Sequence, residues 1–229
     1  MSDKIRLVCA TRESREAFFT STALGRSLSL YGFPFVEVRL FPGNTQGLPH
    51  CYNTAIDEAA ADPALLVFIH DDIWLIDLFW VDRLIDAARA FDISGVAGNR
   101  RRLPGQPAWH LADNLTDWDA RENLSGIVAQ GSGFPPTSVS FYGPAYQEVK
   151  LLDGALLVVP SAKLARHSLR FDERFDFHCY DMDFCRSAEQ RGMSMGTWPL
   201  SIAHESSGTG LGSASWSKDY ARYIEKWGD

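Results

Sequence analysis

The feature that most restricts the fold is a run of five apolar residues, 65–69 (LLVFI), that ends abruptly in His70, Asp71 and Asp72. The run is too short to span a membrane and too uniformly apolar for an amphipathic helix. It predicts a strand of a parallel sheet that is covered on both faces. In open α/β sheets, ligands bind beyond the carboxyl ends of the strands. Two carboxylates and an imidazole there resist burial, so they indicate a compensating group, most naturally a divalent metal.

The three polar residues after this run do not all face the same way. Side chains alternate along a strand, so His70 and Asp72 are predicted to share one face while Asp71 points to the other. His70 and Asp72 are therefore the better candidate pair. Taken alone, the acids are equally well explained as caps of the next helix or as hydrated surface groups.

Strand and helix patterns alternate over the first hundred residues. Parallel neighbours need a crossover connection, so this alternation predicts a mostly parallel sheet flanked by helices on both faces. The expected strands are residues 5–10, 34–41, 65–69 and 93–98, and the expected helices are residues 12–31, 48–61 and 77–91. The chain of 229 residues is predicted to form one α/β domain.

The pattern changes after residue 99. Residues 100–147 are rich in Gly, Pro, Asn and Asp, and they predict a loop-rich insertion whose aromatic residues argue for packing rather than disorder. Residues 148–229 resume the sheet with the run VKLLDGALLVVP, which Asp153 and Gly154 interrupt. Glycine inside a strand often marks a bulge or the close approach of a ligand.

Composition excludes several classes of function. The net charge is −7 and the only basic block is residues 100–102, which argues against binding to nucleic acid or to an acidic membrane surface. No stretch approaches the roughly 20 apolar residues of a transmembrane segment. Four cysteines without a CxxC pair, and no signal-like N-terminus, favour a cytoplasmic protein. Any membrane association is expected to be peripheral, through a partner or an acceptor lipid.

A second acidic cluster lies at residues 170–192, where Asp181 and Asp183 open a stretch with helical periodicity. Carboxylates favour a helix N-terminus, so capping is a complete explanation for at least one of them. Residues two apart on a helix point to nearly opposite sides, so only one of the two is expected to face a site. His204 follows a predicted strand at residues 194–203, and a neutral imidazole is a common metal ligand.

Together these elements resemble the nucleotide-sugar glycosyltransferases of the GT-A fold, in particular the large inverting family 2. In that family a buried strand ends in an acidic D-x-D motif, whose place residues 70–72 take here. Residues 171–192 resemble the family's later acidic segment, which a histidine follows, here His204. The resemblance extends over residues 5–210, and the terminal EKWG at 225–228 is also similar.

The resemblance implies that residues 1–99 bind the nucleotide and that residues 148–229 hold the acceptor and the catalytic group. It also implies a role for each matching residue. Asp72 and His204 would bind a divalent metal, Mn²⁺ or Mg²⁺, that bridges the two phosphates of the donor. Asp181 would be the base that takes the proton from the acceptor hydroxyl, and Asp183 would support the helix start. The implied contacts to the nucleotide sugar come from Thr11, Arg12, Asn53, His70, Asp71, Asp153 and Gly154.

The implied reaction moves a sugar from a nucleoside diphosphate, most simply a UDP-sugar, to a hydroxyl of a glycan or glycolipid precursor in polysaccharide biosynthesis. His70 stands where the family has an acid, and both a metal contact and a ribose contact are open to it. A sugar-nucleotide pyrophosphorylase would carry a Gly-rich basic loop after the first strand, and CATRESRE at residues 9–16 lacks one. A catalytically inactive scaffold that binds nucleotide or glycan remains the alternative.

Overall fold

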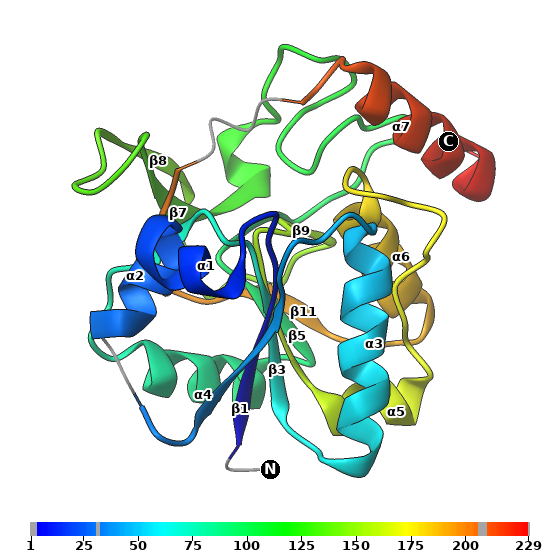
Figure 1. Ribbon diagram of the computed structural model, residues 1–229. Coiled ribbons are helices and arrows are strands. Elements are labelled where there is room, and N and C mark those ends of the chain that lie inside the picture. Colours follow the sequence, from blue (N-terminus) through cyan, green and yellow to red (C-terminus); the bar gives the residue numbers. More distant parts are fainter. Residues whose placement is uncertain (1–3, 31–32, 206–209, 229) are drawn as a thin grey trace.

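The computed structural model describes residues 4–30, 33–205 and 210–228. The described strands form two six-stranded sheets. The first contains β1 (Ile5–Ala10), β2 (Val36–Phe41), β3 (Leu65–Ile69), β5 (Ile93–Gly95), β10 (Leu156–Pro160) and β11 (Met195–Thr197). Its order is β11-β5-β10-β3-β1-β2, and only β10 runs against the others (Figure 1). The predicted α/β fold with a mostly parallel central sheet is confirmed, with one reversed strand.

The second sheet was not predicted. It contains β4 (Ile73–Leu75), β6 (Ala97–Asn99), β7 (Leu124–Gln130), β8 (Ser138–Gly143), β9 (Leu151–Leu152) and β12 (Ile202–His204). Its main order is β4-β12-β7-β6-β9, with β8 paired to β7. β7 and β8 come from the segment predicted as loop, because Gly and Ser residues hide their alternation: β8 is mostly exposed, and only its last two residues are buried.

Several predicted strands are divided between the two sheets. Residues 93–98 split into β5 and β6 around the buried Val96, and residues 194–203 split into β11 and β12. In each case the first half pairs in one sheet and the second half in the other. The apolar pattern is the same on both sides of each break, since both halves are buried, so the sequence does not reveal the break.

Helices cover both faces of the first sheet (Figure 1). The described helices are α1 (Arg15–Ser21), α2 (Ala23–Leu30), α3 (Leu48–Ala61), α4 (Trp80–Ala90), α5 (Ser161–His167), α6 (Tyr180–Gln190) and α7 (Ala214–Trp227), with a short 3₁₀ turn at Arg121–Asn123. Of these, α7 lies beyond the end of the first sheet and covers neither face (Figure 1). The single helix expected at 12–31 is two, because Thr22 is extended and its hydroxyl accepts from the Gly25 N–H at the start of α2. No helix in the described ranges is long and apolar enough to cross a membrane.

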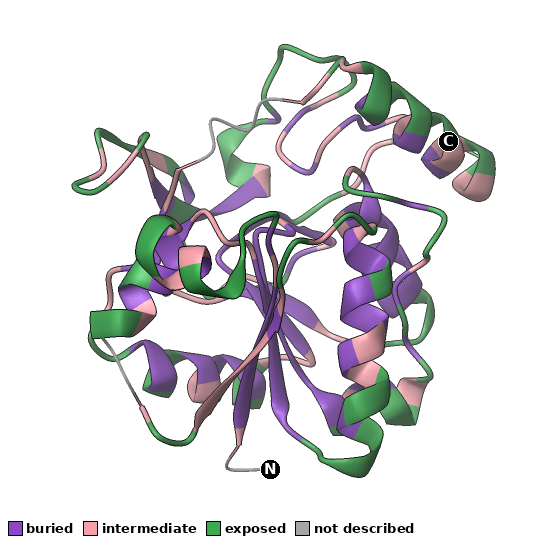
Figure 2. Cartoon of the chain, in the orientation of Figure 1, coloured by how far each residue is buried: buried purple, intermediate pink, exposed green. Residues whose placement is uncertain are grey.

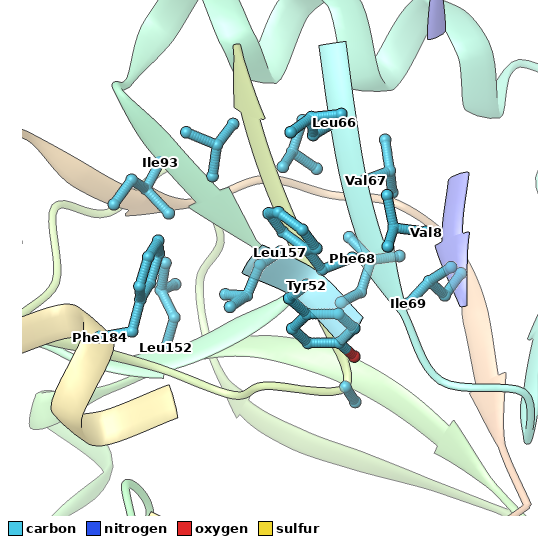
Figure 3. Close-up of a cluster of buried hydrophobic side chains, with 14 of the residues drawn as sticks. Val8, Tyr52, Leu66, Val67, Phe68, Ile69, Ile93, Leu152, Leu157 and Phe184 are labelled. Carbon is cyan, nitrogen blue, oxygen red and sulfur yellow. The ribbon is translucent and has the colours of Figure 1, made fainter. Parts of the chain in front are cut away.

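The core lies along the first sheet and against α3 and α6 (Figure 2). All five residues of β3 are buried, as the run LLVFI predicts. Tyr52 from α3 packs its ring 4.8 Å from that of Phe68, centroid to centroid, in the buried cluster that also contains Leu66 and Leu157 (Figure 3). Burying one such side chain contributes about 1.5–3 kcal/mol to folding. This core makes the end of β3 a rigid platform for the polar residues that follow it.

Candidate active site

A cleft of about 460 Å³ opens where β3 gives way to β4 and β9 gives way to β10. These are two of the places at which the chain passes from one sheet to the other, so the backbone there leaves room for side chains to converge. The polar residues that line the cleft are His70, Asp72, Asp153, Asp181 and His204, among others. None of the described residues that line it is a lysine or an arginine.

Strand pairing brings His204 to Asp72, across 131 residues of sequence. β12 pairs antiparallel with β4, His204 opposite Ile73, and the Glu205 N–H donates to the Asp72 carbonyl at 2.9 Å. As a result His204 Nε2 lies 3.2 Å from Asp72 Oδ1. Together with His70, these residues each offer one ligand atom within 4.8 Å of the others. The predicted common face of His70 and Asp72 is therefore present.

The three side chains are electrostatically linked. Burial by itself would raise the pKa of Asp72, but the neighbouring His204 outweighs it and holds that pKa below its ordinary value. Burial would likewise lower the pKa of His204, and Asp72 reverses this. Burial lowers the pKa of His70, so that this imidazole is neutral at physiological pH. Asp72 Oδ1 and His204 Nε2 are buried without a well-aligned hydrogen bond among the described residues.

Asp71 points away from the cleft, as the strand alternation predicts. Its Oδ2 accepts a 2.6 Å hydrogen bond from the hydroxyl of Thr11, a buried residue at the end of β1. Arg12 is exposed, and neither it nor Thr11 lines the cleft. Asn53 is buried in α3, donates to Phe171 O and Glu173 Oε1, and accepts from Phe171 N. The structure therefore shows Asn53 fastening a loop, and its predicted nucleotide contact stays a prediction.

Asp181 lies at the first turn of α6 and faces the cleft. Its Oδ1 accepts from the Met182 N–H at 2.9 Å, and its Oδ2 accepts from the Gly154 N–H at 3.1 Å. Burial, reinforced by the charge of Asp153, raises the pKa of Asp181 to about 7. A carboxyl whose pKa lies near neutrality can accept a proton and return it at physiological pH, as a general base must.

Asp183 faces the opposite way, which confirms that only one of the two acids faces the site. Its carboxylate receives Lys226 Nζ at 2.6 Å and the Trp227 Nε1–H at 2.9 Å, both from α7. The expectation that Asp183 supports the helix start needs correction, because its side chain fastens α6 to α7 instead. These contacts also give a structural reason for the terminal EKWG.

Gly154 occupies the tightest point of the cleft, in the interruption of the second apolar run. A Cβ atom there would lie 2.5 Å from the Tyr180 hydroxyl and 2.9 Å from Asp181 Cβ, so no larger residue fits without movement. The Tyr180 hydroxyl donates to the Gly154 carbonyl at 2.8 Å and contacts His70 Nε2 at 2.9 Å. Sequence reasoning missed Tyr180, whose position next to Asp181 in CYDMD was the available signal.

Aromatic rings form the far wall of the cleft. Trp118 stacks on Tyr142 at 5.1 Å between centroids, and Trp109 meets the edge of Tyr142 at 4.8 Å. Trp118 is 51% exposed, so one of its faces is open to a ligand. His110 and Trp216 complete this wall. The loop-rich segment therefore contributes binding surface, although no part of it was assigned a residue role.

All three arginines at 100–102 make contacts within the protein. Arg101 pairs with the buried Asp119, and Arg102 pairs with Glu189 at 2.6 Å. Arg100 donates to the Glu122 carbonyl at 3.3 Å. These contacts position the segment 100–123.

The loop 176–178, which contributes Phe177 and His178 to the cleft, is held by α7. Asp219 is 1% exposed, and its Oδ2 accepts from the backbone N–H groups of Asp176, Phe177 and His178 at 3.2–3.3 Å. Phe177 in turn stacks on the imidazole of His70 at 5.7 Å. The last helix therefore supports the cleft from outside it.

Comparison with known proteins places this geometry in context. Residues 41–206 match the family model described as "Glycosyltransferase like family". No curated protein matches the chain in sequence.

Solved structures resemble the chain at low sequence identity. GalNAc-T7, solved with UDP, GalNAc and Mn²⁺, is 11% identical with a TM-score of 0.53, over 99% of this chain and 48% of that one. TarS of S. aureus is 12% identical with a TM-score of 0.49, over 89% of this chain and 37% of that one. The chain thus spans less than half the length of either. With the family match covering most of the sequence and the GT-A fold in place, the chain belongs to the glycosyltransferase-like family.

Proposed function

We propose that this protein is a metal-dependent, inverting glycosyltransferase that uses a nucleoside-diphosphate sugar, most simply a UDP-sugar. The acceptor is a hydroxyl of a glycan or glycolipid precursor. One observation carries the proposal: a carboxyl whose pKa is raised to about 7 and a cluster of two imidazoles and a carboxylate line the same cleft. A proton acceptor beside a cation site is what transfer from a diphosphate to a hydroxyl needs.

The cluster of His70, Asp72 and His204 fits a divalent ion. Asp72 Oδ1 and His204 Nε2 are buried without a well-aligned hydrogen bond among the described residues, as expected of ligand atoms. Two imidazoles with one carboxylate suit Mn²⁺ better than Mg²⁺, which prefers oxygen ligands. The ion, when bound, supplies positive charge to the departing diphosphate. Because no lysine or arginine lines the described cleft, we expect nucleotide binding to depend strongly on this ion.

Asp181 acts as the base in this proposal. Its carboxylate is held by the N–H groups of Met182 and Gly154, which fix its orientation toward the cleft. The acceptor oxygen attacks the anomeric carbon as the bond from that carbon to the diphosphate oxygen breaks. Asp181 takes the hydroxyl proton in the same step. A single displacement inverts the anomeric centre, and the base contributes about 10²- to 10⁴-fold.

The aromatic wall supports a sugar ring as the acceptor. The exposed face of Trp118 offers a flat apolar surface, which suits the C–H face of a pyranose. The absence of basic residues from the described lining favours an uncharged acceptor ring. The contacts to the donor through Thr11, Arg12, Asn53, Asp71, Asp153 and Gly154 remain predictions, and His70 joins the metal cluster.

Calorimetry with UDP and Mn²⁺ tests the proposal. We expect UDP to bind in the presence of Mn²⁺ and to bind at least tenfold more weakly without it. Asp72→Ala should remove the part of the UDP affinity that depends on Mn²⁺. Asp181→Asn should bind UDP and Mn²⁺ as the wild type does, while transfer or donor hydrolysis falls by about 10²- to 10⁴-fold. Absence of metal-linked UDP binding would favour the inactive scaffold, and full activity of either variant would overturn its assigned role.

A further inference from the structure

The hydroxyl of Tyr180 determines where the proton of His70 lies. This hydroxyl is bonded to two groups, the Gly154 carbonyl at 2.8 Å and His70 Nε2 at 2.9 Å. A tyrosine hydroxyl carries one proton, and a carbonyl oxygen can only accept. The Tyr180 proton therefore goes to Gly154, and His70 Nε2 must be the donor in the other bond.

This assignment leaves Nδ1 as the free nitrogen of His70. A neutral imidazole with a proton on Nε2 has its lone pair on Nδ1. Nδ1 has no hydrogen-bond partner among the described residues, and it is not among the buried unpartnered atoms, so it is open to the cleft. Phe177 stacks on the ring at 5.7 Å, so the imidazole is held at its face as well as at Nε2.

We propose that Tyr180 is a positioning residue that fixes His70 as the Nε2–H tautomer and thereby makes Nδ1 the ligand of the metal. The inference rests on the metal site of the proposed function and names the ligand atom within it. It also resolves the choice left open for His70 in favour of the metal. Residues that orient a ligating histidine are worth about 10- to 100-fold in metal affinity.

The same peptide links the metal cluster to the base. The Gly154 carbonyl accepts from Tyr180, which holds His70, while the Gly154 N–H donates to Asp181 Oδ2. The His70 N–H donates to the next carbonyl, that of Ala155, at 3.1 Å. Tyr180 is 3% exposed, so water does not readily replace its hydroxyl.

The test compares Tyr180→Phe with Tyr223→Phe. Tyr223 is equally buried, but it lies on α7 and its hydroxyl accepts from Arg186 Nη1 at 3.3 Å. The first readout is the tautomer of His70 in metal-free protein, from long-range ¹H–¹⁵N NMR, with the signal assigned by its loss in His70→Gln. The second is Mn²⁺ affinity without nucleotide, from electron paramagnetic resonance.

We expect wild type and Tyr223→Phe to show only the Nε2–H tautomer and equal Mn²⁺ affinity. Tyr180→Phe should show both tautomers and bind Mn²⁺ about 10- to 100-fold more weakly. A protonated Nδ1 in the wild type overturns the inference, and this measurement needs no variant to fold. Unchanged Mn²⁺ affinity in folded Tyr180→Phe also overturns it. If the wild type has the expected tautomer but binds no Mn²⁺, the metal dependence of the proposed function fails together with the ligand role.

Discussion

Replacing Asp181 by asparagine is expected to separate stability from catalysis. Asp181 is the proposed base, so the variant should lose transfer activity. In the metal-free protein, however, the same change removes a carboxylate that folding forces into an unfavourable environment. Asp181→Asn should therefore become more stable relative to the wild type as the pH rises.

The size of this effect follows from the pKa of Asp181. Burial first, and then the charge of Asp153, raise that pKa from 3.8 to about 7. Each tenfold change in an ionisation constant is worth about 1.4 kcal/mol, so keeping Asp181 ionised in the folded chain costs about 4 kcal/mol above pH 7. About 1.6 kcal/mol of that cost is already present at pH 5. Asp181 is partly exposed, so water screens its charge and reduces this cost. We therefore expect the stability of Asp181→Asn relative to the wild type to rise by roughly 1 kcal/mol between pH 5 and pH 8.5.

The sign is fixed by proton binding. Between about pH 4 and pH 7 the folded chain holds a proton on Asp181 that the unfolded chain has released, so the stability contributed by this group falls as the pH rises. Urea unfolding of both proteins at pH 5 and pH 8.5, in the presence of EDTA, gives the two differences. Asparagine cannot keep all the backbone hydrogen bonds of Asp181, but that loss of stability is the same at both pH values. It therefore drops out when the difference at pH 5 is subtracted from the difference at pH 8.5. A change of about 1 kcal/mol corresponds to about 2–4 °C in Tm for a domain of this size.

A control variant makes the test specific. The backbone N–H of Glu16 and then the Ser14 hydroxyl lower the pKa of Glu16, an exposed residue of α1, so Glu16 is ionised at both pH values. Glu16→Gln should therefore differ from the wild type by the same amount at pH 5 and at pH 8.5. An Asp181→Asn difference that is equally independent of pH would refute a pKa near 7. With the wild type, transfer activity should rise with pH through about 7, because the base acts when deprotonated.

Three further changes probe the walls of the cleft. Trp118→Ala should raise the KM for the acceptor by up to about tenfold and leave UDP binding unchanged, since ring contacts are worth about 0.5–1.5 kcal/mol; Phe141→Ala, equally exposed but outside the cleft, is the control. Asp219→Asn should lower the free energy of unfolding by about 1.5–3 kcal/mol in urea, because a buried carboxylate that accepts three N–H groups is lost. Gly154→Ala should weaken Mn²⁺ binding at least tenfold by displacing Tyr180. An unchanged Mn²⁺ affinity would show that the backbone around Gly154 moves to accommodate the added methyl group.

Local patterns predicted much of the framework. The helix expected at residues 48–61 is present with those bounds, because Pro49 suits a first turn and the apolar periodicity continues to Ala59. The opposed directions of Asp181 and Asp183 follow from helix geometry alone. Those of Asp71 and Asp72 agree with the predicted alternation, although both residues lie in the turn between β3 and β4. Strand breaks inside apolar runs were missed, because burial on both sides of a break produces no change in pattern.

The sequence by itself determined the alternating α/β framework, the buried strand before His70 and the placing of Asp181 at a helix start. These depend on propensity and periodicity over a few residues. Only the tertiary structure decided that His204 lies beside Asp72, that Asp183 contacts α7, and that Tyr180 reaches both His70 and Gly154. Such contacts join residues far apart in sequence through strand pairing and helix packing, and no local pattern encodes which partner each polar atom finds.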